Sequence, residues 1–207
     1  MARVALRRAT LADVAWLQTW SRDPDVIACT TDDPHATVAF EGTDWTAELS
    51  AQSEVSEYFI AEVDGRPIGA MQICDPHLEP THYWGEIAPN LRAVDIWIGS
   101  GADRNRGYGS EIMRLALLRC FADPRVTAVV IDPLASNVRA HRFYARLGFK
   151  PIARRDFGDD DCLVHELSRH DWQAAGAHAA AHPQASQINE LHGETVAYVL
   201  HHSCVAP

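Results

Sequence analysis

The sequence has no uninterrupted run of about 18 apolar residues, the length that a membrane-spanning helix requires. Its first residues lead directly into Val4-Ala5-Leu6, without the apolar segment of a signal peptide. The 5 cysteines are scattered along the chain, and no Cys-x-x-Cys pair occurs. Because such cysteines are typical of reduced intracellular proteins, the sequence predicts a cytoplasmic protein with no membrane partner.

Positive charge is also scarce. The chain has 18 lysines and arginines against 28 aspartates and glutamates, for a formal net charge of -10. An acidic surface disfavours nucleic acid as a partner and favours a small cationic one. The 11 histidines form no Cys/His framework of the kind that binds zinc, so we expect no metal site. The chain is 47% hydrophobic and 22% charged, which predicts a soluble globular protein with a sizeable core.

A glycine-containing segment near the middle of the chain spans residues 103–110 and reads Asp-Arg-Asn-Arg-Gly-Tyr-Gly-Ser. It follows an apolar run at 94–98 and precedes residues 111–121, whose apolar positions have helical spacing. The local prediction is therefore strand, turn and helix. N–H groups at a helix start lack helical partners, and the dipole is positive there. Gly107 and Gly109 leave the backbone open, and the two arginines add positive charge, so the segment suits a phosphate group.

On the residues alone, this segment fits a phosphate cradle and a simple tight turn equally well. It is not a P-loop, because no Gly-Lys-Ser/Thr follows, and it lacks the third glycine of a dinucleotide fingerprint. A family resemblance distinguishes the two interpretations. The pattern Arg-x-x-Gly-x-Gly after a strand resembles the acetyl-CoA pyrophosphate loop of the GNAT superfamily of N-acetyltransferases.

The sequence that follows continues this resemblance. After a predicted strand at 126–131, residues 137–149 carry the pattern Asn-x-x-Ala-x-x-x-Tyr-x-x-x-Gly-Phe, which is similar to the second CoA-contacting helix of the superfamily. Val94-Asp95 and Asp132-Pro133-x-x-x-Asn137 most resemble the aminoglycoside 6'-N-acetyltransferases, and the siderophore hydroxylysine acetyltransferases share part of the pattern. The close resemblance spans about residues 92–149, and the tail from 168 resembles no family known to us.

The resemblance implies an α/β (α+β) protein with the GNAT fold. Its sheet would be mixed and mostly antiparallel, with a central, splayed parallel pair of strands and flanking helices. The parallel strands would be 93–98 and 126–131, and the strands that close the C-terminal half would be 150–156 and 162–167. Local patterns add a strand at 3–8, a helix that begins at Thr10, and a hairpin across Asp64-Gly65.

The length of 207 residues predicts one domain with an extension. We expect a GNAT acetyltransferase domain at 1–167 and a C-terminal extension at 168–207. The extension would dock on the domain or on a second subunit, so the protein would be a monomer or a homodimer.

The resemblance also implies acetyl-CoA as the co-substrate. Backbone N–H groups of the glycine-containing segment would hold the pyrophosphate, and the edge of the strand at 94–98 would pair with the pantetheine arm. An N–H near Trp97 or Ile98 would polarise the thioester carbonyl. Asn137 would bond the pantetheine arm, cap its own helix, or do both. The residues expected to contact the cofactor are Ile96, Trp97, Ile98, Arg104, Asn105, Arg106, Gly107, Tyr108, Gly109, Ser110, Asn137, Ala140 and Tyr144.

Two residues are the candidate catalytic groups. Asp95 is an acid in an otherwise apolar strand, where it shares a face with Trp97. A buried acid costs free energy unless it is paired or used, so Asp95 either serves the reaction or pairs with an arginine. The resemblance implies that Asp95 binds the acceptor ammonium and relays its proton, directly or through water. It also implies that Tyr144 protonates the leaving thiolate; the alternative is that Tyr144 is a core aromatic of the helix at 137–147.

The acceptor site is expected in the proline-containing segment 75–91 and at nearby strand ends. Aromatic rings beside acids suit a sugar-like polycation, because the rings cover its apolar face and the carboxylates pair with its ammonium groups. The alternatives are that Tyr83 and Trp84 cap the core and that Asp132 begins an Asp-Pro turn. Acids at 23–33 and 156–161 would attract an amine or remain solvated loop charges. The expected substrate-binding residues are Trp84, Glu86, Asp95 and Asp132.

The function predicted from these features is acetyl transfer from acetyl-CoA to a primary amine of a small polycationic acceptor, most like aminoglycoside 6'-N-acetylation. A second hypothesis is acetylation of a siderophore precursor or of a protein amine. A third, from a different class, is a GNAT-fold protein that binds an acyl-CoA or a cationic ligand without turnover.

Overall fold

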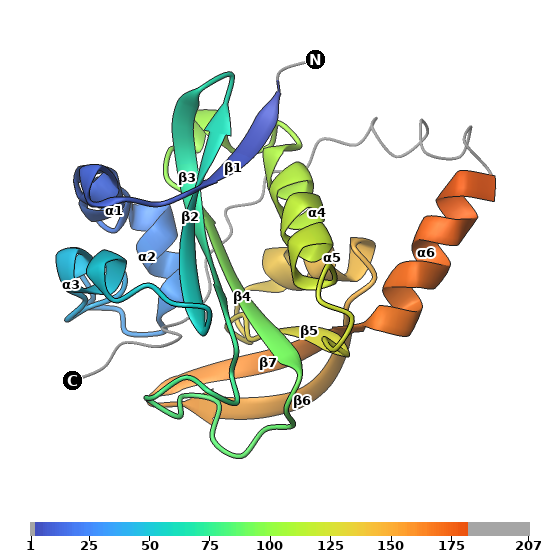
Figure 1. Cartoon of the computed structure of the whole chain (residues 1–207). Coiled ribbons are helices and arrows are strands. Elements are labelled where there is room, and N and C mark those ends of the chain that lie inside the picture. The colour runs from blue at the N-terminus through green and yellow to red at the C-terminus, as the bar shows by residue number, and fades with distance from the viewer. Residues whose placement is uncertain (1–2, 182–207) are drawn as a thin grey trace.

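The computed structural model describes residues 3–181, so the predictions made for 182–207 lie outside the described residues. One seven-stranded sheet runs through the domain in the order β1-β2-β3-β4-β5-β7-β6 (Figure 1). Neighbouring strands are antiparallel except β4 and β5, which are parallel, and this confirms the predicted fold class. The strands are β1 (Val4–Arg8), β2 (Ser56–Val63), β3 (Arg66–Cys74), β4 (Leu91–Ile98), β5 (Ala128–Ile131), β6 (Lys150–Phe157) and β7 (Asp160–Ser168).

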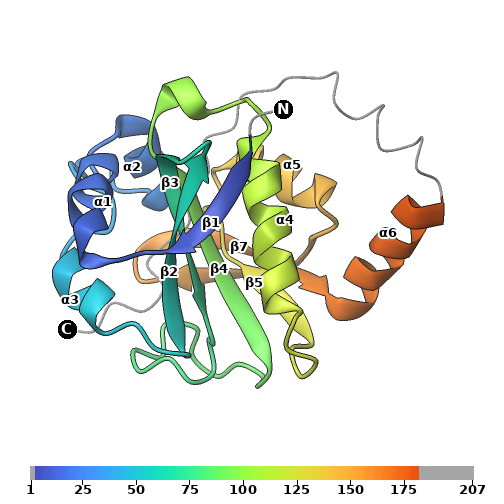
Figure 2. The same ribbon diagram turned by 45° about the horizontal axis from the view of Figure 1, so that its top comes forward.

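Helices cover both faces of this sheet, with α1, α2 and α3 gathered on one side and α4 on the other (Figure 2). No helix within residues 3–181 is long and apolar enough to cross a membrane. The helices are α1 (Val14–Trp20), α2 (Pro24–Thr30), α3 (Trp45–Ser50), α4 (Tyr108–Cys120), α5 (Val138–Arg146) and α6 (Arg169–Ala181), with short 3-10 turns η1 (Leu11–Asp13) and η2 (Gly101–Asp103). Helix α4 begins earlier than the predicted residue 111.

Short polar side chains fix where the helices start. Asp23 accepts hydrogen bonds from the first-turn amides of α2, and Pro24 supplies the preset backbone angle at its first position. Asp44 caps α3 and Asn137 caps α5 in the same way. The segment around α2, for which the sequence allowed a loop or a short helix, is therefore helical because its N-terminus is satisfied locally.

The parallel strands β4 and β5 pair over only their first residues and then diverge. Leu91 to Ala93 of β4 are in register with Ala128 to Val130 of β5, whereas β4 continues to Ile98 beside β3 alone. This arrangement confirms the predicted splay between the two central strands. It exposes one backbone edge of β4 to the space between α4 and α5, where an extended ligand can pair with it.

The alternating side chains of β4 divide the core. Val94, Ile96 and Ile98 join the large apolar cluster under α4 and α5, as the sequence pattern predicted. Trp97 points to the other face and packs with Phe40 and with other aromatic residues of the α1–α3 side. A third cluster lies between the loop at 75–90 and the strands β5, β6 and β7. The splayed edge of β4 thus lies where these packed clusters meet.

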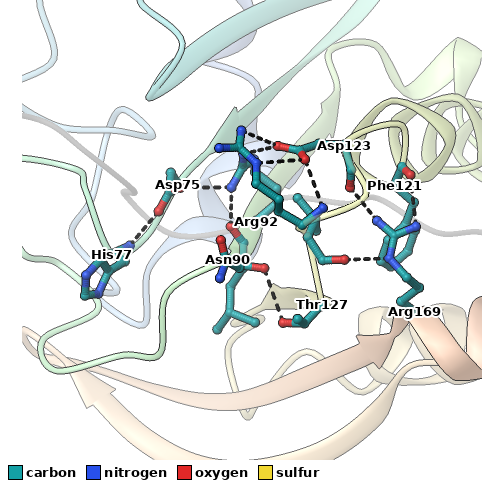
Figure 3. A network of polar contacts seen from close by, with 11 residues as sticks. Asp75, His77, Asn90, Arg92, Phe121, Asp123, Thr127 and Arg169 are labelled. Carbon is teal, nitrogen blue, oxygen red and sulfur yellow. Dashed lines mark hydrogen bonds and ion pairs between the residues drawn. The ribbon is translucent and has the colours of Figure 1, made fainter.

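The first turn of α6 is clamped onto the domain (Figure 3). The Arg169 guanidinium donates to the carbonyl oxygens of Phe121, Asp123 and Val126, which follow the end of α4. Trp172 stacks on Phe121 with ring centroids 4.7 Å apart, and Lys150 pairs with Asp171 at 2.7 Å. Residues 169–172, which lie beyond the predicted domain boundary at 167, therefore contact the domain.

We expect Arg169→Met to lower the free energy of unfolding by about 2 kcal/mol, because three carbonyls lose a charged donor. For a chain of this size that corresponds to a fall in Tm of about 4–8 °C in a thermal melt. His170→Ala, which changes an exposed neighbour, is the matched control and should leave Tm in place. Equal Tm values for both variants would show that the clamp does not stabilise the domain.

Candidate active site

The turn after β4 presents free amides at the start of α4. Glu111 donates the first hydrogen bond within α4, to the carbonyl of Gly107 at 3.3 Å, so the amides of 108–110 have no helical acceptor. Gly107 has a φ of +77°, and a Cβ there would meet no atom within 4 Å. The glycine is therefore required for its backbone conformation and leaves open space above the first turn. The combination of free amides, dipole and open space fits a phosphate group.

The two arginines of the turn have different surroundings. Arg106 is exposed beside the first turn of α4. Arg104 is buried, and its guanidinium pairs with Asp23 at 2.7 Å, with Asp25, and with the carbonyl of Ile98 at 3.1 Å. The prediction that the Arg104 charge contributes to a phosphate cradle is therefore corrected. Its charge is neutralised internally, and the side chain fastens the turn to the start of α2.

Helix α5 carries the other predicted cofactor contacts. The side-chain oxygen of Asn137 accepts from the Ala140 amide at 3.0 Å, whereas its buried Nδ2 group, near the Cys29 thiol, donates to no nitrogen or oxygen atom of the described residues. A buried donor in this state is suited to an amide carbonyl of an extended ligand. Ala140 and Tyr144 lie on the buried face of α5, in the cluster that also contains Ile96. Tyr144 packs edge-on against Phe149.

Asp95 lies on the other face of β4. It is 3% exposed and stands opposite Gln72 of β3. Trp97, two positions along, points the same way and is packed among aromatic residues. Asp95 and Tyr144 thus belong to opposite faces of β4, one on each side of its splayed edge. A reacting group held at that edge would have a carboxylate on one side and a phenol on the other.

An acidic cleft of about 690 Å³ opens between two segments that are distant in the sequence. One wall is the segment from the end of α2 to 41, and the other is the turn between β6 and β7. The Asp160 carboxylate joins the walls, because it accepts from the Thr31 hydroxyl at 2.9 Å and the Asp32 amide at 2.6 Å. The lining side chains include five acids and three aromatic rings, which are Asp32, Asp33, Glu41, Asp159, Asp160, Phe40, Tyr83 and Phe157. Within residues 3–181, no lysine, arginine or histidine lines the cleft.

Not all of the residues predicted to bind the acceptor line this cleft. Trp84 is 1% exposed and packs on Phe157 inside the third cluster, so its assignment to the acceptor site is corrected to a core role. Glu86 is exposed but does not line the cleft. The neighbouring Tyr83 lines it instead. Asp132 lies directly behind Tyr83, whose hydroxyl donates to Asp132 Oδ2 at 2.7 Å.

Burial controls the charge of this inner pair. Loss of water raises the pKa of the Asp132 carboxyl to about 7, while the Tyr83 hydrogen bond and the charge of Arg155 act to lower it. Burial, followed by the charge of Asp132, raises the pKa of Tyr83 well above its usual value, and Asp95 adds to this effect. Tyr83 therefore remains a protonated donor at neutral pH. The structure brings Asp95, Asp132 and Tyr83 to one place.

Among residues 3–181, no group of three or more His, Cys, Asp or Glu side chains is arranged to hold a metal ion. The described residues of the site offer carboxylates, phenols and backbone amides. This set of groups fits the transfer of an acyl group to an amine better than it fits phosphoryl or hydride transfer.

Comparison with known proteins decides the family. The model of the "Acetyltransferase (GNAT) domain" family matches residues 9–157 of this chain. The chain belongs to the GNAT acetyltransferases. As a GNAT acetyltransferase it uses acetyl-CoA, and the free amides of α4 and the buried Nδ2 of Asn137 are suited to hold that co-substrate.

Individual relatives of this GNAT acetyltransferase carry more specific names. Aminoglycoside N(6')-acetyltransferase type 1 of Klebsiella pneumoniae is 30% identical over 149 residues, which are 71% of this chain and 74% of that protein. A kanamycin resistance protein of Rhizobium radiobacter is 34% identical over 74 residues, which are 35% of this chain and 68% of that protein.

The solved structures agree with the fold. Aminoglycoside acetyltransferase AAC(6')-Ib in complex with coenzyme A superposes with a TM-score of 0.70 at 24% identity, over 84% of this chain and 99% of that one. AAC(6')-Ib in complex with ribostamycin and coenzyme A gives a TM-score of 0.69 at 25% identity, over 82% of this chain and 96% of that one. The GNAT fold of this chain therefore extends through most of its length.

Proposed function

We propose that this acetyltransferase transfers the acetyl group of acetyl-CoA to the 6'-amine of an aminoglycoside. The observation that carries the proposal is the acidic, aromatic-lined cleft at Tyr83, which contacts Asp132; none of the described residues that line this cleft is cationic. A polycationic sugar meets both of its needs there, since carboxylates pair with ammonium groups and rings cover the apolar sugar face. The names of the two relatives support the same substrate class. The small cationic partner and the cytoplasmic location predicted from the sequence belong to this proposal.

The protonation state of the acceptor sets the main demand on the enzyme. An alkyl amine with a pKa of ~10.4 is neutral in only about one molecule in 2,500 at pH 7. This penalty amounts to roughly 4.6 kcal/mol at 1.36 kcal/mol for each pH unit. The protein must therefore bind the ammonium form, remove one proton, and hold the neutral amine against the acetyl group, which the bound co-substrate supplies as an activated thioester.

The roles of the residues follow from their places. The amides of 108–110 are assigned to the pyrophosphate and the edge of β4 to the pantetheine arm, with an N–H near Trp97 or Ile98 for the acetyl carbonyl. Asp95, buried beside the splay, takes the ammonium proton, directly or through water. Tyr144, on the opposite face, gives a proton to the departing thiolate. Asp132 contributes negative charge at the inner end of the cleft.

The direct test is acetyl-CoA-dependent thiol release with a panel of amines: kanamycin- and neomycin-type aminoglycosides, polyamines, hydroxylysine and short peptides. We expect saturable turnover of the aminoglycosides with KM in the micromolar range. An aminoglycoside with a hydroxyl in place of its 6'-amine is the matched control and should bind without turnover. Turnover of hydroxylysine or peptides alone would replace the acceptor and keep the chemistry. Tight CoA binding without turnover of any amine would favour a non-catalytic binding protein.

A further inference from the structure

Tyr83 stands between the acidic cleft and the buried carboxylate behind it. The residue lines the cleft, and its hydroxyl donates to Asp132 Oδ2 at 2.7 Å. The sequence predicts that the aromatic residues of this loop either contact the acceptor or cap the core, and of the two adjacent rings only Trp84 is among the expected substrate-binding residues. The contact with Asp132 gives Tyr83 a polar function that Trp84 lacks.

The loop at 75–90 holds Tyr83 in one place from three directions. The fully buried Glu79 accepts hydrogen bonds from the backbone amide of Tyr83 and from the amide and hydroxyl of Thr81. The Tyr83 ring stacks on Phe157 with centroids 4.6 Å apart and an interplanar angle of 12°. Arg155 donates to the carbonyl of the next residue, Trp84, at 2.9 Å. Because the buried carboxylate of Glu79 binds the backbone of this loop, the Tyr83 ring is held in a fixed position.

The surroundings of the Asp132 carboxylate favour the approach of a cation. It follows β5 at the splayed end, is 1% exposed, and its Oδ1 accepts no hydrogen bond from another described residue. Two side chains act on its charge: Tyr83 of the loop, through its hydrogen bond, and Arg155 of β6. The charge of Asp132 in turn raises the pKa of the Cys162 thiol of β7 and the pKa of Tyr83, to which Asp95 of β4 also contributes. Since a buried carboxylate oxygen without a donor is costly, the site gains free energy when a cation approaches.

We propose that Tyr83 is a positioning residue, which holds the carboxylate of Asp132 at the inner end of the acidic cleft so that its charge attracts an ammonium group of the acceptor. The proposal rests on the proposed function for the identity of the acceptor. The positioning role depends on one hydrogen bond, from the Tyr83 hydroxyl to Asp132 Oδ2. The Tyr83 hydroxyl stabilises the ionised carboxylate, and without it burial and the more distant charge of Arg155 determine how much of Asp132 is charged.

The test is Tyr83→Phe, which keeps the ring and its stacking on Phe157 and removes the hydroxyl. The Tyr83 hydrogen bond lowers the pKa of the Asp132 carboxyl, so its removal should raise this pKa further above about 7. The ratio of kcat/KM between variant and wild type cancels the titration of the acceptor amine. We expect this ratio to be about tenfold below unity at pH 6 and close to unity at pH 9.

Two variants make this result specific. Tyr58→Phe removes the same kind of contact elsewhere, because the Tyr58 hydroxyl donates to Glu48 at 3.0 Å in the aromatic cluster, and it should leave the pH profile unchanged. Asp132→Asn should lower kcat/KM at every pH and abolish the effect of Tyr83→Phe in the double variant. A carbon-13 NMR titration of the aspartate carboxyls, with Asp132 assigned from Asp132→Asn, measures its pKa without turnover.

The possible results distinguish the positioning role of Tyr83 from the proposed identity of the acceptor. A ratio that is equally low at pH 6 and pH 9, or an Asp132 carboxyl that titrates alike with and without the Tyr83 hydroxyl, would overturn the positioning role. The expected NMR shift in a protein that acetylates no aminoglycoside would support the positioning role and refute the proposed acceptor. Both results as expected would support both claims.

Discussion

Asp95→Asn is expected to lower kcat/KM for the acceptor by about 10²- to 10⁴-fold, the usual contribution of a positioned proton acceptor. The substitution keeps the shape of the side chain and removes only its ability to take a proton. Asp95 is 3% exposed in β4, so bulk water is poorly placed to replace it. Because the pyrophosphate amides lie at the start of α4, acetyl-CoA binding should remain near the wild-type value in a calorimetric titration.

The control for this experiment is another buried aspartate. Asp13 pairs with Arg7 at 2.6 Å near the N-terminus, so Asp13→Asn should lower Tm and leave kcat/KM unchanged. Kinetics across pH 6 to 9 separate the two variants. If kcat/KM of Asp95→Asn matched the wild type over this range, Asp95 would not be the base, and a carboxylate of the cleft would have to take that role.

Arg104→Met is expected to lower the free energy of unfolding by about 3 kcal/mol, because removal of one partner leaves buried charges and carbonyls unsatisfied. The guanidinium bridges Asp23 of the α2 cap to the carbonyls of Ile98 and Gly99 at the end of β4. Asp25, the third partner, remains largely solvated, so the effect should not reach the upper limit for fully buried pairs. Thermal or denaturant unfolding measures the change.

Arg106→Met supplies the contrast, since this neighbour is exposed on the same turn. We expect its stability to stay within about 0.5 kcal/mol of the wild type, as is usual for surface substitutions. Its affinity for acetyl-CoA should fall, because the remaining positive side chain near the phosphate site is lost. Equal destabilisation by the two substitutions would contradict the internal role assigned to Arg104.

Much of the fold is predictable because its signals are local. The Asp64-Gly65 turn adopts positive φ at both residues, as a two-residue hairpin requires, and the alternation along β4 separates Trp97 from Val94 without reference to any distant contact. The splayed pair and the cofactor turn were predicted through the family pattern, which encodes their arrangement as a spacing between motifs.

The site was less predictable because its contacts join distant residues. The partners of Arg104 lie 79 and 81 positions away, so no local pattern indicates that this arginine is neutralised. In the loop at 75–90 no periodicity determines which of two adjacent aromatics faces the cleft, so the sequence alone does not distinguish Tyr83 from Trp84. The acidic stretches around 32 and 160 were each visible, but only the structure shows that they form opposite walls.

The ion pair between Lys150 and Asp171 has a chemical consequence for an acetylating enzyme. Lys150 is the single lysine of the chain, and every other cationic side chain that stays charged at neutral pH is an arginine. A guanidinium remains protonated and is a poor nucleophile, whereas a lysine amine competes for acetyl groups once it is deprotonated. The Lys150 amine pairs with Asp171 at 2.7 Å. The side chains of this protein thus offer its own reagent a single alkyl amine.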